Sequence, residues 1–218
     1  MSLERRRTFE GRTKSARSGR GGDDGRVGPN AAIQLLRVLS ARTDPERRRM
    51  IVVLAGATQW ASVEPTGMID EGGAAALHAT TRMVLGRERA IAVLTEAGAL
   101  TGDYILLNRI PAFARAVLKA TPSPLAARLL ARAISAHAWT FVGSGRFVRP
   151  ARNGRTLEIW SNPFCAGERS DEPLCVWHAA VIERLYRALV SSKLRVKETH
   201  CLARGDECCR FVVKGNGR

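Results

Sequence analysis

The residues best suited to chemistry in this chain are five cysteines near its C-terminal end: Cys165, Cys175, Cys201, Cys208 and Cys209. Residues 1–20 carry charges but no apolar stretch, so they do not have the pattern of a secretory signal, and the expected compartment is the cytoplasm. An odd number of cysteines in that compartment argues against a disulfide framework. The cysteines therefore indicate metal binding or thiol chemistry. The alternative is a group of reduced thiols that pack as small hydrophobic side chains.

The alternation of side chains along the last predicted strand separates two of these cysteines. Cys209 shares the parity of Phe211, which is expected to point inward, whereas Cys208 shares that of Arg210 and is expected to face solvent. Cys175 opens a predicted helix, where the helix N-terminus stabilises a thiolate. We therefore expect Cys209 and Cys175 to approach each other inside the fold.

Two residues of other types could join the cysteines. His178 lies three residues after Cys175 on the same predicted helix and could reach the same metal, although a hydrogen-bonded core histidine is the favoured interpretation. Glu198 and Cys201 are three apart on a predicted strand, and a regular strand would place them on opposite faces. They converge only if the strand ends near His200.

The elements that must position these residues follow from the hydrophobic periodicity. Residues 28–136 have a helical pattern. The predicted helices cover 31–41, segments that start at 44 and 70, and 87–109, 112–120, 124–136 and 175–190. Alternation predicts strands over 138–148 and 156–161, and a final hairpin over 193–200 and 208–213 that turns at Gly205–Asp206. The expected fold class is α+β (α/β in the broad sense), with a helical N-terminal half packed on a four-stranded antiparallel sheet and a β-β-α-β-β C-terminal half.

Composition and charge limit the partners. The chain has 218 residues, of which 45% are hydrophobic, and its net charge of +15 favours anionic partners. No nucleic-acid-binding motif accompanies this charge, so nucleic acid is not expected. No run of about 18 apolar residues occurs, so no membrane-spanning helix is expected. Residues 1–27, rich in Arg, Gly and Ser, are predicted to be a disordered basic arm that could touch the surface of a photosynthetic membrane.

Several sequence runs resemble a known family. The C-x-A-x-G-D-x-x-C-R-F run over 201–211 resembles the 4-vinyl reductase domain family. Longer runs resemble the bacteriochlorophyll 4-vinyl reductases within it: GPNAAIQLL at 28–36, EAGALTGDYILLNRIP at 96–111, HAWTFVGSGRF at 137–147 and NPFCAGE at 162–168. The resemblance covers about residues 26–214, so the domain is expected to span 28–214, with a zinc-binding C-terminal part at 138–214.

The resemblance implies a fold and a metal site. The fold is similar to nitric-oxide-sensing and vesicle-tethering domains, which often form homodimers. Family members that sense phenols hold zinc with a Cys, then Glu-x-x-Cys, then a Cys eight residues on, which corresponds here to Cys175, Glu198, Cys201 and Cys209. Alternation also selected Cys209, whereas Glu198 rests on the resemblance. Four protein ligands leave no open position, so a structural Zn²⁺ is expected. The role of Cys165 stays open.

A second set of residues could bind the pigment that the resemblance implies. A magnesium tetrapyrrole requires an apolar slot, an axial ligand and a cation for its carboxylates. The set comprises His137, Trp139, Phe141, Tyr104, Asn108 and Arg109. The first three alternate on one face of a predicted strand, and the last three end a long helix before a proline. The alternatives are that the aromatic residues are plain core and that Arg109 caps helix carbonyls.

The family name implies reduction of a vinyl group, which needs a hydride source. No G-x-G-x-x-G follows a predicted strand, because Gly143–Ser144–Gly145 lacks the third glycine, and no iron–sulfur spacing occurs. The expected function is therefore a carrier or accessory factor that holds a Mg-protoporphyrin or divinyl protochlorophyllide intermediate. The expected partners are pathway enzymes such as magnesium chelatase or the methyltransferase after it.

Two alternatives belong to other functional classes. The protein could be the 4-vinyl (8-vinyl) reductase itself, with NADPH or a partner as electron donor. It could also be a sensor of small aromatic compounds, but a sensor must couple two sites and no output domain is evident.

Overall fold

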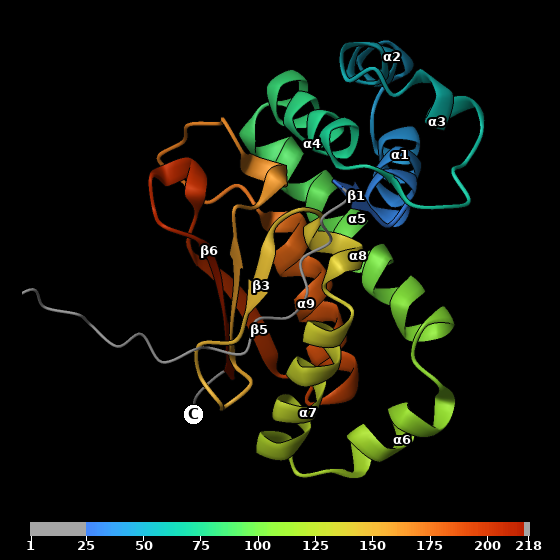
Figure 1. Cartoon of the computed structure of the whole chain (residues 1–218). Helices are drawn as coiled ribbons and strands as arrows, with labels where there is room; N and C mark the ends of the chain where they lie inside the picture. The colour runs from blue at the N-terminus through green and yellow to red at the C-terminus, as the bar shows by residue number, and fades with distance from the viewer. Residues whose placement is uncertain (1–24, 216–218) are drawn as a thin grey trace, which may run out of the picture.

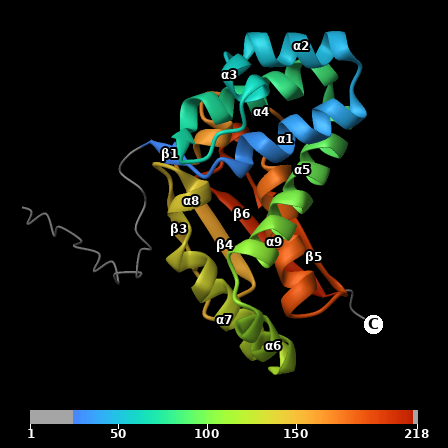
Figure 2. The same cartoon turned by 90° about the vertical axis from the view of Figure 1, so that its right-hand side faces the viewer.

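The described part of the chain, residues 25–215 of a computed structural model, is built around a four-stranded antiparallel sheet (Figure 1). Helix α9 packs on strand β5 of this sheet, α5 packs on α9, and α1 packs on α5 (Figure 2). The helices are α1 (Asn30–Arg42), α2 (Pro45–Leu54), α3 (Thr58–Ser62), α4 (Glu71–Leu85), α5 (Arg87–Asn108), α6 (Ala112–Ala120), α7 (Ser123–Ala136), α8 (Trp139–Val142) and α9 (Val176–Leu189). The strands are β1 (Arg26–Val27), β2 (Ile69–Asp70), β3 (Arg146–Val148), β4 (Thr156–Trp160), β5 (Leu194–His200) and β6 (Cys209–Gly215), with short 3-10 turns η1 (Pro163–Cys165) and η2 (Leu202–Arg204).

The sheet has the strand order β3-β4-β6-β5, and all its pairs are antiparallel. Cys209 pairs with Ile159 of β4, and Phe211 pairs with both Leu157 and Glu198. The inward-facing Cys209, Phe211 and Leu157 are buried. The α+β class and the β-β-α-β-β order of the C-terminal half are therefore confirmed.

The N-terminal helices begin where their capping residues predict. The Asp44 side chain accepts a hydrogen bond from the backbone N–H of Arg47 at 3.0 Å, and Asp70 accepts one from Gly73 in the same way. Gly86 separates α4 from α5 with a φ of 71°, a backbone conformation that favours glycine. These local signals explain why the helix starts at 44 and 70 could be predicted from the sequence alone.

The predicted strand over 138–148 is wrong in its first half. Trp139–Val142 form helix α8, and only Arg146–Val148 form strand β3. The chain turns at Gly143, and Ser144 then donates its backbone N–H and its hydroxyl to the carboxylate of Glu71, both at 2.6 Å. A tertiary contact with α4 thus ends the segment that alternation had extended into a strand.

The N-terminal boundary also differs from the prediction. Arg26 and Val27, assigned from sequence to the arm, form β1 and pair with Asp70 and Ile69 of β2. Val27 is fully buried. The rest of the predicted arm, residues 1–24, lies outside the described residues.

One helix among residues 25–215 has the length and composition to cross a membrane, although no such segment was expected from the sequence. This helix is α5, with a mean hydropathy of 1.4 over its most apolar window, 44% of which is buried. Its inner face packs against α9 and α1. The core helix of a soluble protein meets the same criteria, so this feature is weak evidence for a membrane span.

Candidate functional site

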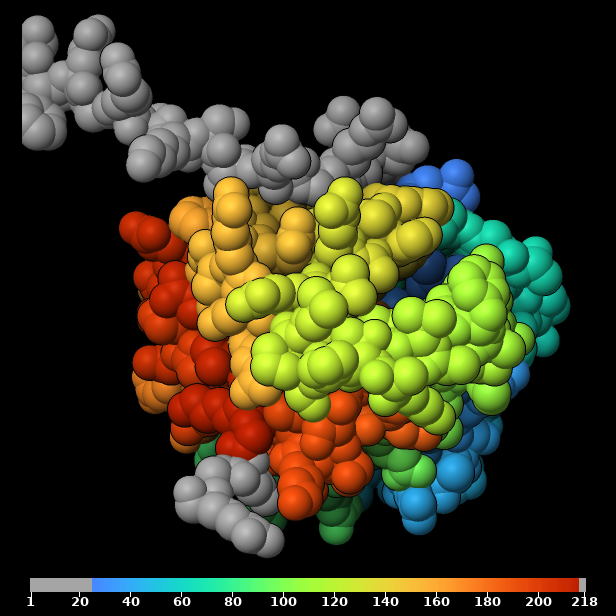
Figure 3. All heavy atoms as spheres, turned by 90° about the horizontal axis from the view of Figure 1, so that it is seen from below, coloured from blue at the N-terminus to red at the C-terminus, as the bar shows by residue number. Residues whose placement is uncertain are grey.

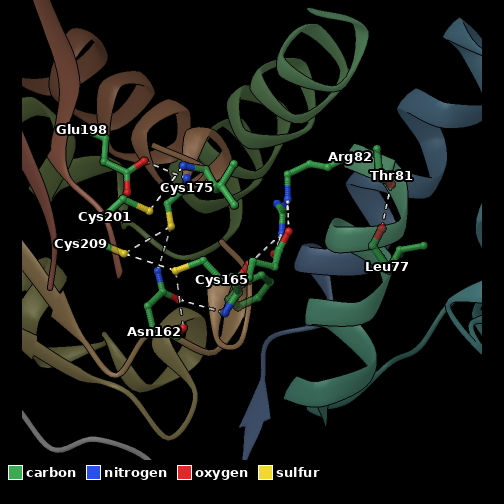
Figure 4. Close-up of polar contacts among 12 residues, drawn as sticks. Leu77, Thr81, Arg82, Asn162, Cys165, Cys175, Glu198, Cys201 and Cys209 are labelled. Carbon is green, nitrogen blue, oxygen red and sulfur yellow. Dashed lines mark hydrogen bonds and ion pairs between the residues drawn. The ribbon is translucent and has the colours of Figure 1, made fainter. Parts of the chain in front are cut away.

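Four of the five cysteines meet in one buried cluster (Figure 4). They are Cys165 of η1, Cys175 at the N-cap of α9, Cys201 just after β5, and Cys209 at the start of β6. The four Sγ atoms all lie within 4.8 Å of one another. The Sγ of Cys209 is 3.4 Å from that of Cys175 and 3.5 Å from that of Cys165. None of the five cysteines is in a disulfide bond.

The local geometry of β5 brings Glu198 and Cys201 to the same site. Strand β5 ends at His200, and its pairing with β6 shifts register between Glu198 and His200. This irregularity breaks the alternation that would have separated the two side chains, as the sequence required for convergence. The backbone N–H of Cys201 then donates to Oδ2 of Asp206 at 2.8 Å, which holds the turn closed.

Glu198 lies beside the sulfur atoms, and only one of its oxygens has a partner. Its Oε2 accepts a hydrogen bond from the backbone N–H of Cys175 at 2.8 Å, whereas Oε1 is buried without a hydrogen-bond partner. Burial, together with the charges of Cys201 and Cys209, raises the pKa of Glu198 to about 10. Hydrogen bonds to Cys165, Cys201 and Cys209 likewise raise the pKa of Cys175. Without a cation, therefore, these groups cannot all be ionised at neutral pH.

The donor set fits a tetrahedral metal ion. Zinc–sulfur bonds of about 2.3 Å place the sulfurs of a tetrahedral site roughly 3.8 Å apart, close to the spacing found here. The Asn162 side-chain amide donates to the Sγ of Cys175 at 3.3 Å, and the backbone N–H of Leu174 donates to that of Cys201 at 3.5 Å. Such N–H donors stabilise thiolates. The four cysteines could therefore hold a metal ion, and Glu198 is close enough to share in the site through its interaction with Cys175.

The structure adds one residue to the set expected from sequence and corrects another. Cys165, whose role was open, completes the sulfur cluster, and the loop that carries it had only its place in the NPFCAGE run as a signal. Cys208 is buried, so its predicted exposure to solvent is wrong. It lies near the ion pair of Arg210 with Glu158, whose carboxylate is itself buried on that face of the sheet.

His178 is a core histidine, as the favoured interpretation predicted. It is buried, and its Nε2 lies 3.1 Å from the backbone oxygen of Phe141. His78 on α4 is also buried, with its Nε2 3.0 Å from the backbone oxygen of Ala31. Both imidazoles pack edge-on against Phe164 and Trp177, which stack on each other. This aromatic layer joins η1 to α4 and α9.

These two histidines predict how stability depends on pH. Burial lowers the pKa of His78 to about 3 and that of His178 to about 4, from an ordinary value of 6.5. Between these values the unfolded chain binds more protons than the folded one, so the contribution is complete above pH 6.5 and is lost as the pH falls toward 4. At pH 5 each histidine is expected to cost about 2 kcal/mol of unfolding free energy.

Denaturant unfolding at several pH values measures this slope. In His78→Gln, an amide can keep the bond to Ala31 but does not titrate, so the free energy should fall less between pH 7 and pH 5, by about 2 kcal/mol. A variant with the wild-type slope would contradict the assignment.

The residues expected to bind pigment fall into two groups that flank the start of α1. On α5, Thr101 donates its hydroxyl to the backbone oxygen of Asn30 at 3.4 Å, and Tyr104 and Asn108 follow on the same stripe of the helix. From α8, the backbone oxygen of Thr140 accepts the N–H of Gly28 at 2.6 Å. Figure 3 shows a hollow between these segments, with the blue of the N-terminal region at its floor.

The individual side chains differ in accessibility. Arg109 and His137 are exposed, and the guanidinium of Arg109 lies 5.8 Å from the ring centroid of Tyr104. Trp139 is 43% exposed on α8. Phe141 is turned inward and packs against Phe147, as the core interpretation predicted. The helical form of α8 therefore separates Phe141 from the two residues with which alternation had grouped it.

Known proteins resemble both the C-terminal part and nearly the whole chain. The model of the 4-vinyl reductase domain matches residues 156–215. The bacteriochlorophyll synthase 23 kDa chain of Cereibacter sphaeroides is 45% identical over 193 residues, which cover 88% of this chain and 92% of that protein. The chain belongs to this family. The protein of the same name from Rhodobacter capsulatus is 42% identical and covers 90% of each chain.

Two more distant matches complete the comparison of this 23 kDa chain family member. An uncharacterised protein of Methanocaldococcus jannaschii is 31% identical over 64 residues, 29% of this chain and 35% of its own. The crystal structure of the phenol-responsive sensory domain of the transcription activator PoxR with phenol has a TM-score of 0.47 at 15% identity, covering 79% of this chain and 91% of that domain.

Membership of the 23 kDa chain family confirms part of the resemblance drawn from sequence. The domain match over 156–215 includes strands β4, β5 and β6 and every residue of the cysteine cluster. The names of the two 23 kDa relatives refer to bacteriochlorophyll synthase and not to a vinyl reductase. The residues expected to bind pigment lie N-terminal to the matched domain, in the helical half of the protein.

Proposed function

We propose that this protein takes part in bacteriochlorophyll synthesis by binding a magnesium tetrapyrrole intermediate as a carrier or accessory factor. The observation that carries the proposal is its 45% identity, over nearly the full length, to a protein named as a chain of bacteriochlorophyll synthase. A subunit of that kind works beside other enzymes of the pathway, such as magnesium chelatase or the methyltransferase after it. The intermediate is of the Mg-protoporphyrin or divinyl protochlorophyllide type.

The hollow between α5 and α8 is the pigment site in this proposal. Tyr104 and Trp139 offer aromatic surface from its two sides, and His137 offers an imidazole nitrogen as an axial ligand. Arg109, at the end of α5, offers a guanidinium that pairs with a propionate. Asn108 donates its amide to the backbone oxygen of Tyr104 at 3.0 Å and so serves to hold the end of α5.

A specific contact favours the carrier over the reductase. The Gly143–Ser144–Gly145 loop is the turn that the sequence invites one to compare with a nucleotide loop, and such loops bind phosphate through free backbone N–H groups. Here the N–H of Ser144 already donates to Glu71, and a Cβ on Gly143 would lie 1.9 Å from Oε2 of the same carboxylate. A buttressing acid thus occupies the place that a phosphate would need.

Absorbance titration of the full-length protein with Mg-protoporphyrin tests this function. We expect a saturable Soret shift with one pigment per site, and no conversion of a divinyl pigment after NADPH is added. Replacing Arg109 by alanine removes a charge-assisted hydrogen bond and should weaken binding about tenfold. His137→Ala should change the Soret position, because it removes the axial nitrogen.

Arg152→Ala is the matched control for loss of an exposed arginine, and it should bind as the wild type does. Unchanged binding in both Arg109→Ala and His137→Ala would place the pigment elsewhere. Repeated turnover of a divinyl pigment with NADPH would make the protein the reductase, and preference for phenol over the pigment would make it a sensor.

For the metal cluster, we propose a structural zinc ion. Cys175, Cys201 and Cys209 hold it, and the sulfur spacing supports Cys165 as the fourth ligand, with Glu198 accepting the N–H of Cys175. The set implied by family resemblance instead has Glu198 as the fourth ligand. When bound, zinc supplies a cross-link between η1, α9, β5 and β6. A cytoplasmic location and a homodimer stay predictions.

A further inference from the structure

Helix α6 presents apolar side chains to solvent at one end of the molecule. Phe113 and Val117, one turn apart on this helix, are 74% and 57% exposed. No residue of α6 is buried, and the helix touches the rest of the fold only through its inner side, against α7 and α9. Figures 1 and 2 show α6 and α7 at the end of the molecule opposite α2 and α3, and Figure 3 shows them in front. Burial within the chain therefore does not explain why these side chains are apolar.

The same region has a one-sided charge. Between Asp103 and Glu158 the sequence contains no acidic residue. It contains nine basic residues, namely Arg109, Arg115, Lys119, Arg128, Arg132, Arg146, Arg149, Arg152 and Arg155. Among residues 25–215, the salt bridges of the fold involve none of these nine. The basic residues of α6 and α7 therefore keep their charge available to an external anion.

An exposed apolar stripe flanked by unpaired basic side chains is the pattern of a helix that lies in a lipid–water interface. Phe113 and Val117 would enter the boundary between headgroups and acyl chains, while Lys119 and Arg128 extend their charged ends to lipid phosphates. A second copy of the chain fits this face poorly, since a twofold axis would bring basic residues against basic residues.

We propose that α6, together with the adjoining basic side chains of α7, docks this protein on an anionic membrane surface. This inference goes beyond pigment binding and does not depend on it. It also differs from the expectation that the N-terminal arm makes the membrane contact, because it places the apolar contact on α6. The partner is the lipid surface itself, recognised by its negative charge and by an accessible apolar layer.

Vesicle flotation with the full-length protein tests the proposal. Vesicles of phosphatidylcholine alone are compared with vesicles in which about one third of the lipid is phosphatidylglycerol. We expect binding to the anionic vesicles only, with a loss of several-fold at high salt. Phe113→Ser combined with Val117→Ser should lower the partition coefficient about tenfold. Lys119→Gln combined with Arg128→Gln should lower it several-fold at low salt.

Matched controls lie at the other end of the molecule. Leu54→Ser combined with Val63→Ser removes two residues that are 58% and 73% exposed, and Arg49→Gln combined with Arg89→Gln removes two exposed arginines. Both controls should bind vesicles as the wild type does.

Three results would overturn the proposal. Wild-type binding by the α6 variants would assign any membrane contact to the arm or to another surface, and equal binding to neutral vesicles would exclude recognition of lipid charge. A change of oligomeric state in the α6 variants, seen by size-exclusion chromatography without a change in flotation, would make α6 a subunit interface.

Discussion

Removing the metal, or replacing Cys201 by serine, is expected to lower the melting temperature by at least about 10 °C. Four buried sulfurs and a buried carboxyl group would then face one another without a cation, and breaking one partner of a buried charged group typically costs about 3–5 kcal/mol. In a chain of this size each kcal/mol shifts the melting temperature by roughly 2–4 °C. Thermal unfolding before and after chelation, with metal analysis of the same samples, measures both quantities.

Cys208→Ser is the matched control, because Cys208 is also buried but lies outside the sulfur cluster. It should keep the full metal content and lose far less stability. Folded, gently purified protein without stoichiometric metal would show that the cluster is a group of packed thiols.

Two further variants identify the fourth ligand. If Cys165 ligates the ion, Cys165→Ser loses metal affinity and Glu198→Gln keeps the ion while its contact to the N–H of Cys175 weakens. The opposite result, with metal lost in Glu198→Gln and kept in Cys165→Ser, would establish the ligand set that the family resemblance implies. Metal content at equal protein concentration distinguishes the two cases.

Replacing Gly98 by leucine is expected to destabilise the protein by about 3 kcal/mol or more, a change of roughly 6–12 °C in melting temperature. Gly98 lies where α5 crosses α9, and a Cβ there would be 2.5 Å from the backbone oxygen of Trp177 and 2.7 Å from the Cβ of Ala180. Because a backbone oxygen cannot rotate away, the two helices would have to separate. This separation would also move Cys175, which begins α9, away from the other sulfurs.

Gly67→Leu is the matched control, because a Cβ at Gly67 has no neighbour within 4 Å. It should leave the melting temperature nearly unchanged. Gly98→Ala should fall between the two, and a Gly98→Leu protein as stable as the wild type would contradict the close approach of α5 and α9. Metal analysis of Gly98→Leu shows whether loss of the helix contact also opens the cysteine cluster.

The sequence alone determined the helical N-terminal half, the four strands around α9 and three members of the cysteine cluster. The starts of α2 and α4 follow from the side chains of Asp44 and Asp70, which hydrogen-bond within their own first turns. The inward position of Cys209 follows from alternation along β6, a property of any regular strand. Each of these predictions depends on residues that are close together in the sequence.

Only the tertiary structure decided the features that depend on contacts between distant segments. Helix α8 replaces a predicted strand where Glu71 takes the hydrogen bonds of Ser144, 73 residues away. Cys165 joins the cluster because η1 packs on α4 through an ion pair of Arg82 with Glu168, and Glu198 joins it because β5 shifts register. Local periodicity carries no information on such contacts, since their energy exists only once the chain has folded.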